Sequence, residues 1–330
     1  MIEQSESEWE LVISDNDESP DLTRLVAAAF AKDPRVRYIR TSGNLSMHDN
    51  WENALKFSRG SWILVLEDKQ RLAPQALNFI RQTCQQNPDS IVSYPFIISS
   101  RECVQSARQK PRIRRFSCET VVEEFCRFSP LYWKIFPRGL TSCAPRHIFE
   151  NARRKSSTGL VFSYINPDYA SGFQLLSQAK DLVYIDEPII IVPPSVHKSK
   201  VNYSNGKASM TKQPSYDQFL NTIPILIKKI TADCPIPSIH LWPNLVIYDF
   251  HHHYNRSGHK PKIHRAGYQA QCLMIIIQAK IYGTSVLPEI QLTLKSFKKG
   301  NLSSNLHTIF LLFWRSLQAV CRRVCSSFDT

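Results

Sequence analysis

Hydrophobic and polar positions alternate along the first 200 residues in a repeated order of strand, loop and helix. Short apolar runs typical of strands occur at 10–14, 36–40, 62–66 and 90–98. Between these runs, apolar residues recur at helical spacing in 21–31, 47–58 and 74–86. This order predicts an α/β fold with a mostly parallel sheet flanked by helices and right-handed crossovers.

The second half of this region continues the pattern less regularly. Residues 100–117 are rich in basic and polar side chains and predict a mobile loop, whereas 199–213 is polar and typical of a linker. Helices are expected at 118–128, after Pro145 and at 169–179, and strands at 182–185 and 189–192. We therefore predict a first domain over residues 1–205 and a basic, mainly helical C-terminal region over 206–330.

Composition narrows the class of protein. The chain has 330 residues, of which 43% are hydrophobic, and no run approaches the roughly 20 apolar residues that span a bilayer. Its nine cysteines include no Cys-x-x-Cys pair, and the polar, acidic N-terminus does not resemble a signal peptide. These features favour a soluble or peripheral protein of a reducing cytoplasm, at the inner face of the membrane if it contacts one.

Positive charge is concentrated near the C-terminus. The chain carries a net charge of +13, and from residue 251 onward eleven Lys and Arg residues face only Glu289 and Asp329. The tail lacks interleaved aromatic and basic residues, so we expect no nucleic-acid partner. A solvated basic face and a membrane-facing one both remain open.

The segment 301–328 predicts a basic amphipathic helix. On a helix its apolar residues fall on one face, with Arg315 and Arg322 opposite. The apolar face consists of Leu306, Ile309, Phe310, Phe313, Leu317, Val320 and Val324. Such a helix could contact a membrane surface, or it could dock onto the rest of the chain or a second subunit.

A run of three histidines, 251–253, raises the possibility of a metal site. No Cys or acidic residue lies at a spacing typical of zinc ligands. A solvated polar loop is therefore the favoured interpretation of this segment.

Acidic residues follow two of the expected strands. Asp15 comes directly after the first strand and Asp68 after the third. In parallel sheets ligands bind outside the carboxyl ends of strands, so both could serve a ligand site. Asp15 could accept hydrogen bonds from a nucleobase, and Asp68 could hold a ribose or a metal that bridges phosphates. Solvated turn carboxylates are the alternative.

Three segments together resemble one enzyme family. They are ELVISDN at 10–16, LSMHDNWENA at 45–54 and GSWILVLEDKQRL at 60–72. Their order is similar to that of the family 2 glycosyltransferases, which have the GT-A nucleotide-diphospho-sugar transferase fold. The resemblance implies a nucleotide-sugar donor held by Asp15, Asn50, Asp68 and Lys69, with Asp15 on the base and Asp68 on ribose, diphosphate and a divalent Mg or Mn ion. It also implies a role in cell-envelope polysaccharide biosynthesis.

The resemblance extends into the expected acceptor half. Residues 137–145, the segment Asn166-Pro167-Asp168-Tyr169 and residues 186–188 look like the corresponding parts of the family. An acid at a helix start there serves as general base, and Asp168 is the matching residue. Its alternative role is a helix cap. The resemblance implies inverting transfer of a hexosyl group to a glycan, a lipid-linked saccharide or another hydroxyl acceptor.

Two departures from the family pattern qualify this function. Only eight residues precede Trp9, where the family has a first strand and helix, so the fold is expected to be truncated at its N-terminus. Lys69 replaces an acid and cannot ligate a cation, although its ammonium could neutralise a diphosphate. We therefore expect weak or absent metal dependence. The alternative function is a catalytically inactive GT-A-fold binding or scaffold protein.

Overall fold

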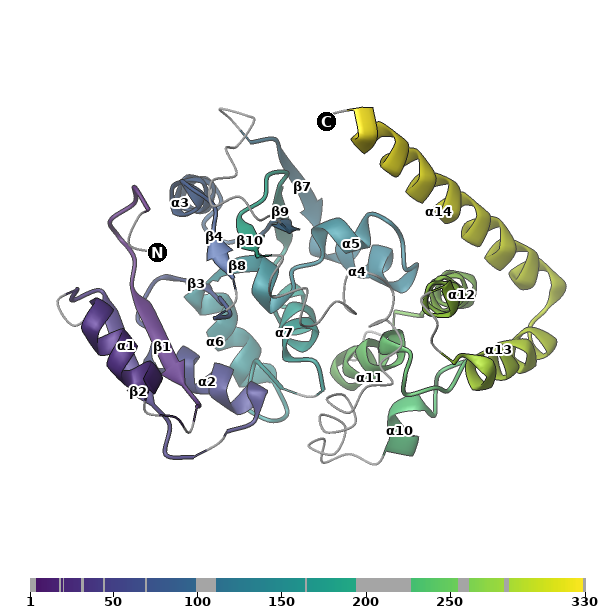
Figure 1. Ribbon diagram of the computed structural model, residues 1–330, viewed down its shortest axis with the longest axis horizontal. Helices are drawn as coiled ribbons and strands as arrows, with labels where there is room; N and C mark the ends of the chain where they lie inside the picture. The colour runs from purple at the N-terminus through teal and green to yellow at the C-terminus, as the bar shows by residue number, and fades with distance from the viewer. Residues whose placement is uncertain are drawn as a thin grey trace. The chain divides into compact units, whose positions relative to one another are not determined.

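The computed structural model divides the chain into two compact units, which are coloured by residue number in Figure 1. Unit 1 contains 1–121 and 135–196, and unit 2 contains 122–134 and 197–330. The structure describes residues 4–17, 19, 21–30, 33–43, 45–68, 70–98, 111–163, 165–193, 227–254, 261–281 and 285–328. Within these ranges, no helix has the length and apolarity needed to cross a membrane.

Unit 1 is an α/β unit in which helices alternate with strands, as the sequence predicts. Its helices are α1 (Asp21–Phe30), α2 (Met47–Phe57), α3 (Ala76–Gln86), α6 (Arg146–Lys155) and α7 (Pro167–Leu176). The short helix η1 (Gly139–Thr141) precedes β8, and α4 (Cys118–Cys126) and α5 (Tyr132–Ile135) lie at the boundary with unit 2. Its strands are β1 (Leu11–Asp15), β2 (Val36–Arg40), β3 (Trp62–Leu64), β4 (Arg71–Leu72), β5 (Ile91–Ser93), β6 (Phe96–Ile98), β7 (Ile113–Ser117), β8 (Ser142–Pro145), β9 (Asp181–Ile185) and β10 (Ile190–Val192).

The largest sheet is mixed rather than mostly parallel. It has the strand order β3-β8-β5-β9-β7. Only β5 and β9 pair in parallel, whereas β8 runs antiparallel to both β3 and β5, and β7 runs antiparallel to β9. The predicted α/β class is confirmed, but strand direction differs because β8 and β7 are antiparallel insertions that the strand–helix alternation does not reveal.

Two segments differ from their predicted secondary structure. The apolar run 90–98 forms two strands, because β5 joins the five-stranded sheet while β6 pairs with β10 in a three-stranded sheet. Pro95 stands between them and has no N–H to donate to a ladder, which accounts for the break. The predicted loop 100–117 is wrong at its end, where 113–117 forms the edge strand β7; residues 99–110 lie outside the described part of the chain.

The buried centre of unit 1 lies between α3 and the sheets. Residues on β5, β9 and β10 contact the inner face of α3, where Ala76 and Ile80 are buried. Cys84 and Cys143 belong to this cluster as free thiols, and a hydrogen bond with Cys143, together with burial, raises the pKa of the Cys84 thiol. Such buried thiols behave as small apolar side chains.

Unit 2 consists of helices: α10 (Ile227–Thr231), α11 (Trp242–Tyr254), α12 (Arg265–Ile281), α13 (Leu287–Lys299) and α14 (Leu302–Phe328). Its core surrounds Tyr268 on α12, whose hydroxyl donates to Asn244 on α11 at 2.6 Å. Gly267 allows α12 to approach the Arg127 backbone, because an added Cβ would lie 2.1 Å from its carbonyl oxygen. The predicted domain boundary at 205 remains a prediction.

The histidine run 251–253 is helical, which corrects the prediction of a solvated loop. These residues form the last turn of α11 and are half-buried. Burial lowers the pKa of His251, and it lowers the pKa of His253 to about 4. The histidines lie between Phe250 and Tyr254 in sequence, and both of these aromatic side chains are buried. Among the described residues, no three His, Cys, Asp or Glu side chains gather as a metal would require.

Candidate functional site

Asp15 ends β1 and organises the loop that follows. Its carboxylate is 3% exposed, accepts the Asp17 N–H at 2.9 Å and accepts the Tyr38 hydroxyl. Desolvation and this carboxylate raise the pKa of Tyr38, so the phenol stays protonated and keeps donating. Asp15 is thus placed at the carboxyl end of a strand, as predicted, but it is buried within its own turn.

Asn16 and Asn50 hold the neighbouring segments together. The Asn16 side chain accepts the Leu45 N–H and donates to the Leu45 carbonyl, both at 2.6 Å. Asn50, on α2, accepts the Ser14 hydroxyl at 2.6 Å and donates to the Ser14 carbonyl at 3.2 Å. The segments 10–16 and 45–54, which resemble the family in sequence, are therefore joined by hydrogen bonds.

The second acidic segment follows β3. Asp68 is exposed and Glu67 is half-buried, in a tight turn where Gln70 donates its N–H to the Glu67 carbonyl at 3.0 Å. The Gln70 side chain accepts the Glu67 N–H at 3.1 Å, which fixes the turn from both sides. Lys69 lies outside the described residues.

Asp168 stands in the first turn of α7, directly after Pro167 at the helix start. Pro fits this position because its missing N–H would have no partner inside the helix. The N-cap residue of α7 is Asn166, which directly precedes Pro167, so Asp168 is not the N-cap. Its carboxylate lies beside the positive end of the helix.

Two charged side chains act on the Asp168 carboxyl. Burial raises the pKa of the Asp168 carboxyl, the positive charge of Arg138 opposes that rise, and the negative charge of Glu67 adds to it. Gly139 allows the Arg138 turn to approach α7 closely, because an added Cβ would lie 3.1 Å from the Ser171 hydroxyl oxygen on that helix. We call Glu67, Arg138 and Asp168 the charged triad.

The charged triad combines residues from two regions that separately resemble the family in sequence. Glu67 comes from the turn after β3 and Asp168 from the expected acceptor half. Arg138 was not predicted as a site residue, although the Pro137-Arg138-Gly139 turn is visible in the sequence. Its guanidinium lies 5.7 Å from the Phe96 ring centre, a contact that a single sequence does not show.

The described residues do not form a metal site by themselves. Asp68 has no companion pair of His, Cys, Asp or Glu side chains close enough to complete a ligand group of three. Mg²⁺ usually needs only one or two protein carboxylates when substrate phosphates and water supply the other oxygens. A metal beside Asp68 would therefore need further oxygens from a bound diphosphate and from water.

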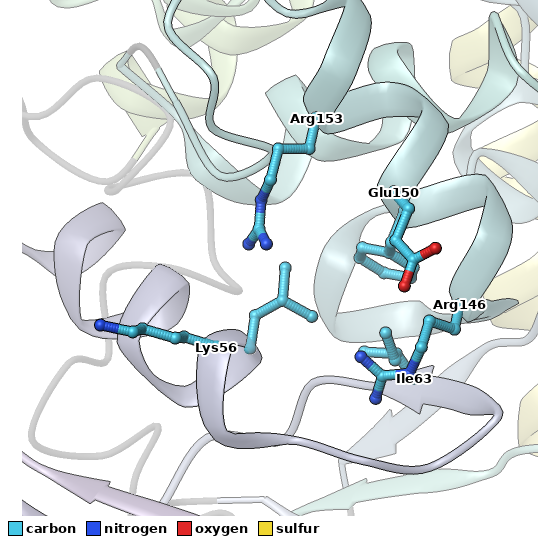
Figure 2. A pocket seen from close by; sticks show the side chains of 7 residues that line it. Lys56, Ile63, Arg146, Glu150 and Arg153 are labelled. Atoms are coloured by element: carbon cyan, nitrogen blue, oxygen red, sulfur yellow. The ribbon is translucent and has the colours of Figure 1, made fainter.

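A small pocket of about 110 Å³ lies away from the strand-end acids, between α2 and α6. Figure 2 shows Arg146, Glu150 and Arg153 projecting from α6 toward Lys56 and Ile63. Arg146 donates to the Gly60 carbonyl at 2.8 Å, and Arg153 donates to Glu52 at 2.8 Å. None of the predicted site residues lines this pocket, and its arginines have structural partners.

Glu52 beside this pocket is expected to stabilise unit 1 strongly. Its buried carboxylate accepts the Phe162 N–H at 2.7 Å and the Val161 N–H, as well as Arg153. Glu52→Ala should lower the free energy of unfolding by roughly 2–4 kcal/mol, because each buried donor left without a partner costs about 1–3 kcal/mol. Urea denaturation measures this change. Glu150→Ala, which removes an exposed carboxylate of the same pocket, is the control, and equal effects of the two variants would contradict the prediction.

Fold and site together define an α/β protein with Asp15 at the end of β1, Asp68 in the turn after β3 and Asp168 at the start of α7. Residues 1–142 match the model of Glycosyl transferase family 2. This match confirms the predicted family resemblance and, with the α/β architecture, the GT-A class of fold. It covers β1 through η1 and includes Asp15, Asn50, Glu67, Asp68 and Arg138.

Known proteins are similar to this chain in sequence or in fold, over different parts of its length. A protein described as uncharacterized protein y4gI, from Sinorhizobium fredii (strain NBRC 101917 / NGR234), is 32% identical over 92 residues, or 28% of this chain. The chain spans 10% of that protein's length. The crystal structure of S. aureus TarS 1-349 has a TM-score of 0.46 and 11% identity, covering 91% of this chain and 85% of TarS 1-349. Its complex with UDP-GlcNAc also has a TM-score of 0.46, with 8% identity and coverages of 91% and 86%.

Proposed function

We propose that this protein transfers a sugar from a nucleotide-diphospho-sugar to a hydroxyl acceptor, a glycan or a lipid-linked saccharide. The family match over residues 1–142 supports the reaction class. The observation that carries the proposal to a mechanism is the charged triad, in which Asp168 lies within the electrostatic influence of Arg138 and of Glu67 from the strand-end turn. We assign the catalytic region to residues 1–205.

On the donor side, Asp15 would orient the nucleobase. Each of its carboxylate oxygens already accepts one hydrogen bond, and a carboxylate oxygen can accept two. Asn50 would hold the β1 end in place through Ser14, and Asp68, exposed in its turn, would bind ribose and diphosphate. Lys69 would neutralise charge on the leaving diphosphate.

On the acceptor side, Asp168 would remove the proton from the attacking hydroxyl. A general base must be ionised when the acceptor binds, and a raised pKa makes its carboxylate a better proton acceptor. Arg138 would keep that carboxylate ionised by its positive charge. In-line attack by the activated hydroxyl on the sugar would invert the anomeric carbon.

The competing function is a non-catalytic binding or scaffold protein that retains the fold. Lys69 at an acidic position of the family pattern favours this alternative. Incubation with UDP-, GDP- and dTDP-sugars and a set of saccharide acceptors tests the choice, with product detected by mass spectrometry and donor binding measured by calorimetry. Sugar transfer supports the enzyme, whereas binding of a donor without transfer across the panel supports the scaffold.

Metal dependence is expected to be weak. The described residues hold no group of three His, Cys, Asp or Glu side chains that could bind a metal, and Lys69 can supply positive charge where the family uses a cation. Transfer should therefore retain most of its rate in EDTA, and Lys69→Ala should make the rate depend on added Mg²⁺ or Mn²⁺. Lys56→Ala, which changes a lysine of the α2–α6 pocket, is the control. Complete loss of wild-type transfer in EDTA, with recovery only on adding Mn²⁺ or Mg²⁺, would contradict this expectation.

The acceptor class suggests where the reaction takes place. A lipid-linked acceptor would require the enzyme at the inner face of the membrane, in the cytoplasm, in a pathway of cell-envelope polysaccharide biosynthesis. Fractionation of cells producing the full chain, before and after washing membranes with salt, tests this location.

A further inference from the structure

Helix α14 in unit 2 is packed with its polar face inward. Thr308 is fully buried and donates to Gln269 on α12 at 3.1 Å. Arg315, 8% exposed, donates to the backbone carbonyls of Gly267 and Phe128. A soluble helix normally buries its apolar stripe and exposes its polar one, so this packing is the reverse of the usual arrangement.

The outward face of α14 is correspondingly apolar. Its side chains recur at helical spacing over three turns and are 48–74% exposed. We call these six residues the apolar face: Leu302, Leu306, Ile309, Phe310, Phe313 and Trp314. The face includes four residues of the stripe predicted from the sequence, with Arg315 on the other side, as predicted; side chains from 317 onward lie outside the described set.

Charge on the adjoining helices has one sign. Lys298 and Lys299 end α13, three residues before α14 begins, and both are exposed, as are Lys280 and Lys295. In residues 261–281 and 285–316, the single acidic side chain is Glu289, which is 2% exposed and accepts the Ser238 hydroxyl at 3.2 Å. The exposed charge of α12, α13 and this part of α14 is therefore positive.

We propose that the apolar face of α14 binds an anionic lipid surface. Apolar and aromatic side chains of an interfacial helix enter the boundary between headgroups and acyl chains, while nearby lysines attract acidic headgroups. Trp314 suits this boundary because its indole has both an apolar body and an N–H donor. The proposal is independent of sugar transfer, since it concerns binding alone.

Charge also argues against a second copy of the chain as the occupant. A twofold interface places the same surface patch of each subunit against the other. The exposed charge of the helices around the apolar face is positive in each copy, so two copies would bring like charges into one interface, which opposes association. An anionic membrane offers the opposite charge.

Vesicle flotation with the full 330-residue chain tests the proposal. Mixed phosphatidylcholine–phosphatidylglycerol vesicles should carry the protein to the top of the gradient, and pure phosphatidylcholine vesicles should carry much less. Phe310→Glu with Phe313→Glu should weaken binding to the mixed vesicles about tenfold or more, because both exposed rings leave the apolar face. High salt should weaken wild-type binding by screening the lysines.

The matched control is Ser303→Glu with Ser316→Glu, which adds the same charge to exposed positions of α14 without removing an apolar side chain. It should retain more binding than the phenylalanine variant. Equal loss in the two variants, or no flotation of the wild type, would overturn the proposal. A wild-type dimer in light scattering that the phenylalanine variant converts to a monomer would also overturn it and would assign the face to self-association. Circular dichroism and thermal melting confirm that both variants are folded.

Discussion

Asp168→Asn is expected to lower kcat for sugar transfer by about 10²- to 10⁴-fold, the contribution typical of a general base. An amide has nearly the same shape as a carboxylate but cannot take the proton from the acceptor hydroxyl. The KM for the donor should change little, because the residues proposed to bind the donor lie on β1, α2 and the turn after β3. Steady-state kinetics with the donor identified from the panel measure both constants.

The same variant should be more stable at neutral pH, because of the direction of the pKa shift. Burial raises the Asp168 pKa above its ordinary 3.8, so the folded state favours the protonated carboxyl. The stability from this proton is complete below pH 3.8 and is lost as the pH rises through the folded-state pKa. The amide of the variant stays neutral throughout, so Asp168→Asn should raise Tm near pH 7 and change it little below pH 3.8.

Asp186→Asn is the control for both measurements. It makes the same chemical change in the same half of unit 1, at a carboxylate that lies 3.8 Å from Arg114 and outside the charged triad. Its kcat should stay close to wild type. Retention of activity by Asp168→Asn would refute the assignment of the base. A fall in Tm at neutral pH would instead show that the ionised carboxylate stabilises the fold.

The local sequence pattern was sufficient to predict the strands and helices that are determined by nearby residues. The strands β1, β2 and β9 and the helices α2, α6 and α7 lie within a few residues of their predicted bounds, because each has an apolar period and a polar or proline boundary. Asp15 could likewise be proposed as a site residue from its place at a strand end, whereas Asp168 was proposed from the family resemblance of its segment.

Features that depend on distant contacts could not be predicted in this way. The antiparallel direction of β8 and the pairing of β7 with β9 join segments far apart in the chain. Arg138 became a site candidate only when η1 and α7 were brought together. For α14, the sequence identified two faces, but which face is buried depends on Gln269 and on the carbonyls that Arg315 meets.

Gly172→Ala is expected to disturb both stability and catalysis, because α7 packs against the chain segment before Arg138 with no space for a methyl group. An added Cβ would lie 2.6 Å from the Pro137 carbonyl oxygen and 2.8 Å from Cε1 of Phe136. Backbone and a buried ring must then move, at a typical cost of about 1–3 kcal/mol in the free energy of unfolding. Asp168 lies in the first turn of the same helix, so a displacement of its carboxylate by about 1 Å should lower kcat by about 10²-fold.

Urea denaturation and steady-state kinetics separate these two effects of Gly172→Ala when Gly43→Ala is measured beside it. An added Cβ at Gly43 meets no atom within 4 Å, so that variant makes the same substitution without a clash and should behave as wild type. If Gly172→Ala loses stability but keeps kcat, the Asp168 carboxylate tolerates movement of α7 and the geometry of the charged triad is not critical. If kcat falls with stability, while Gly43→Ala keeps both, the close contact at Gly172 is what holds Asp168 beside Arg138 in the position that proton removal requires.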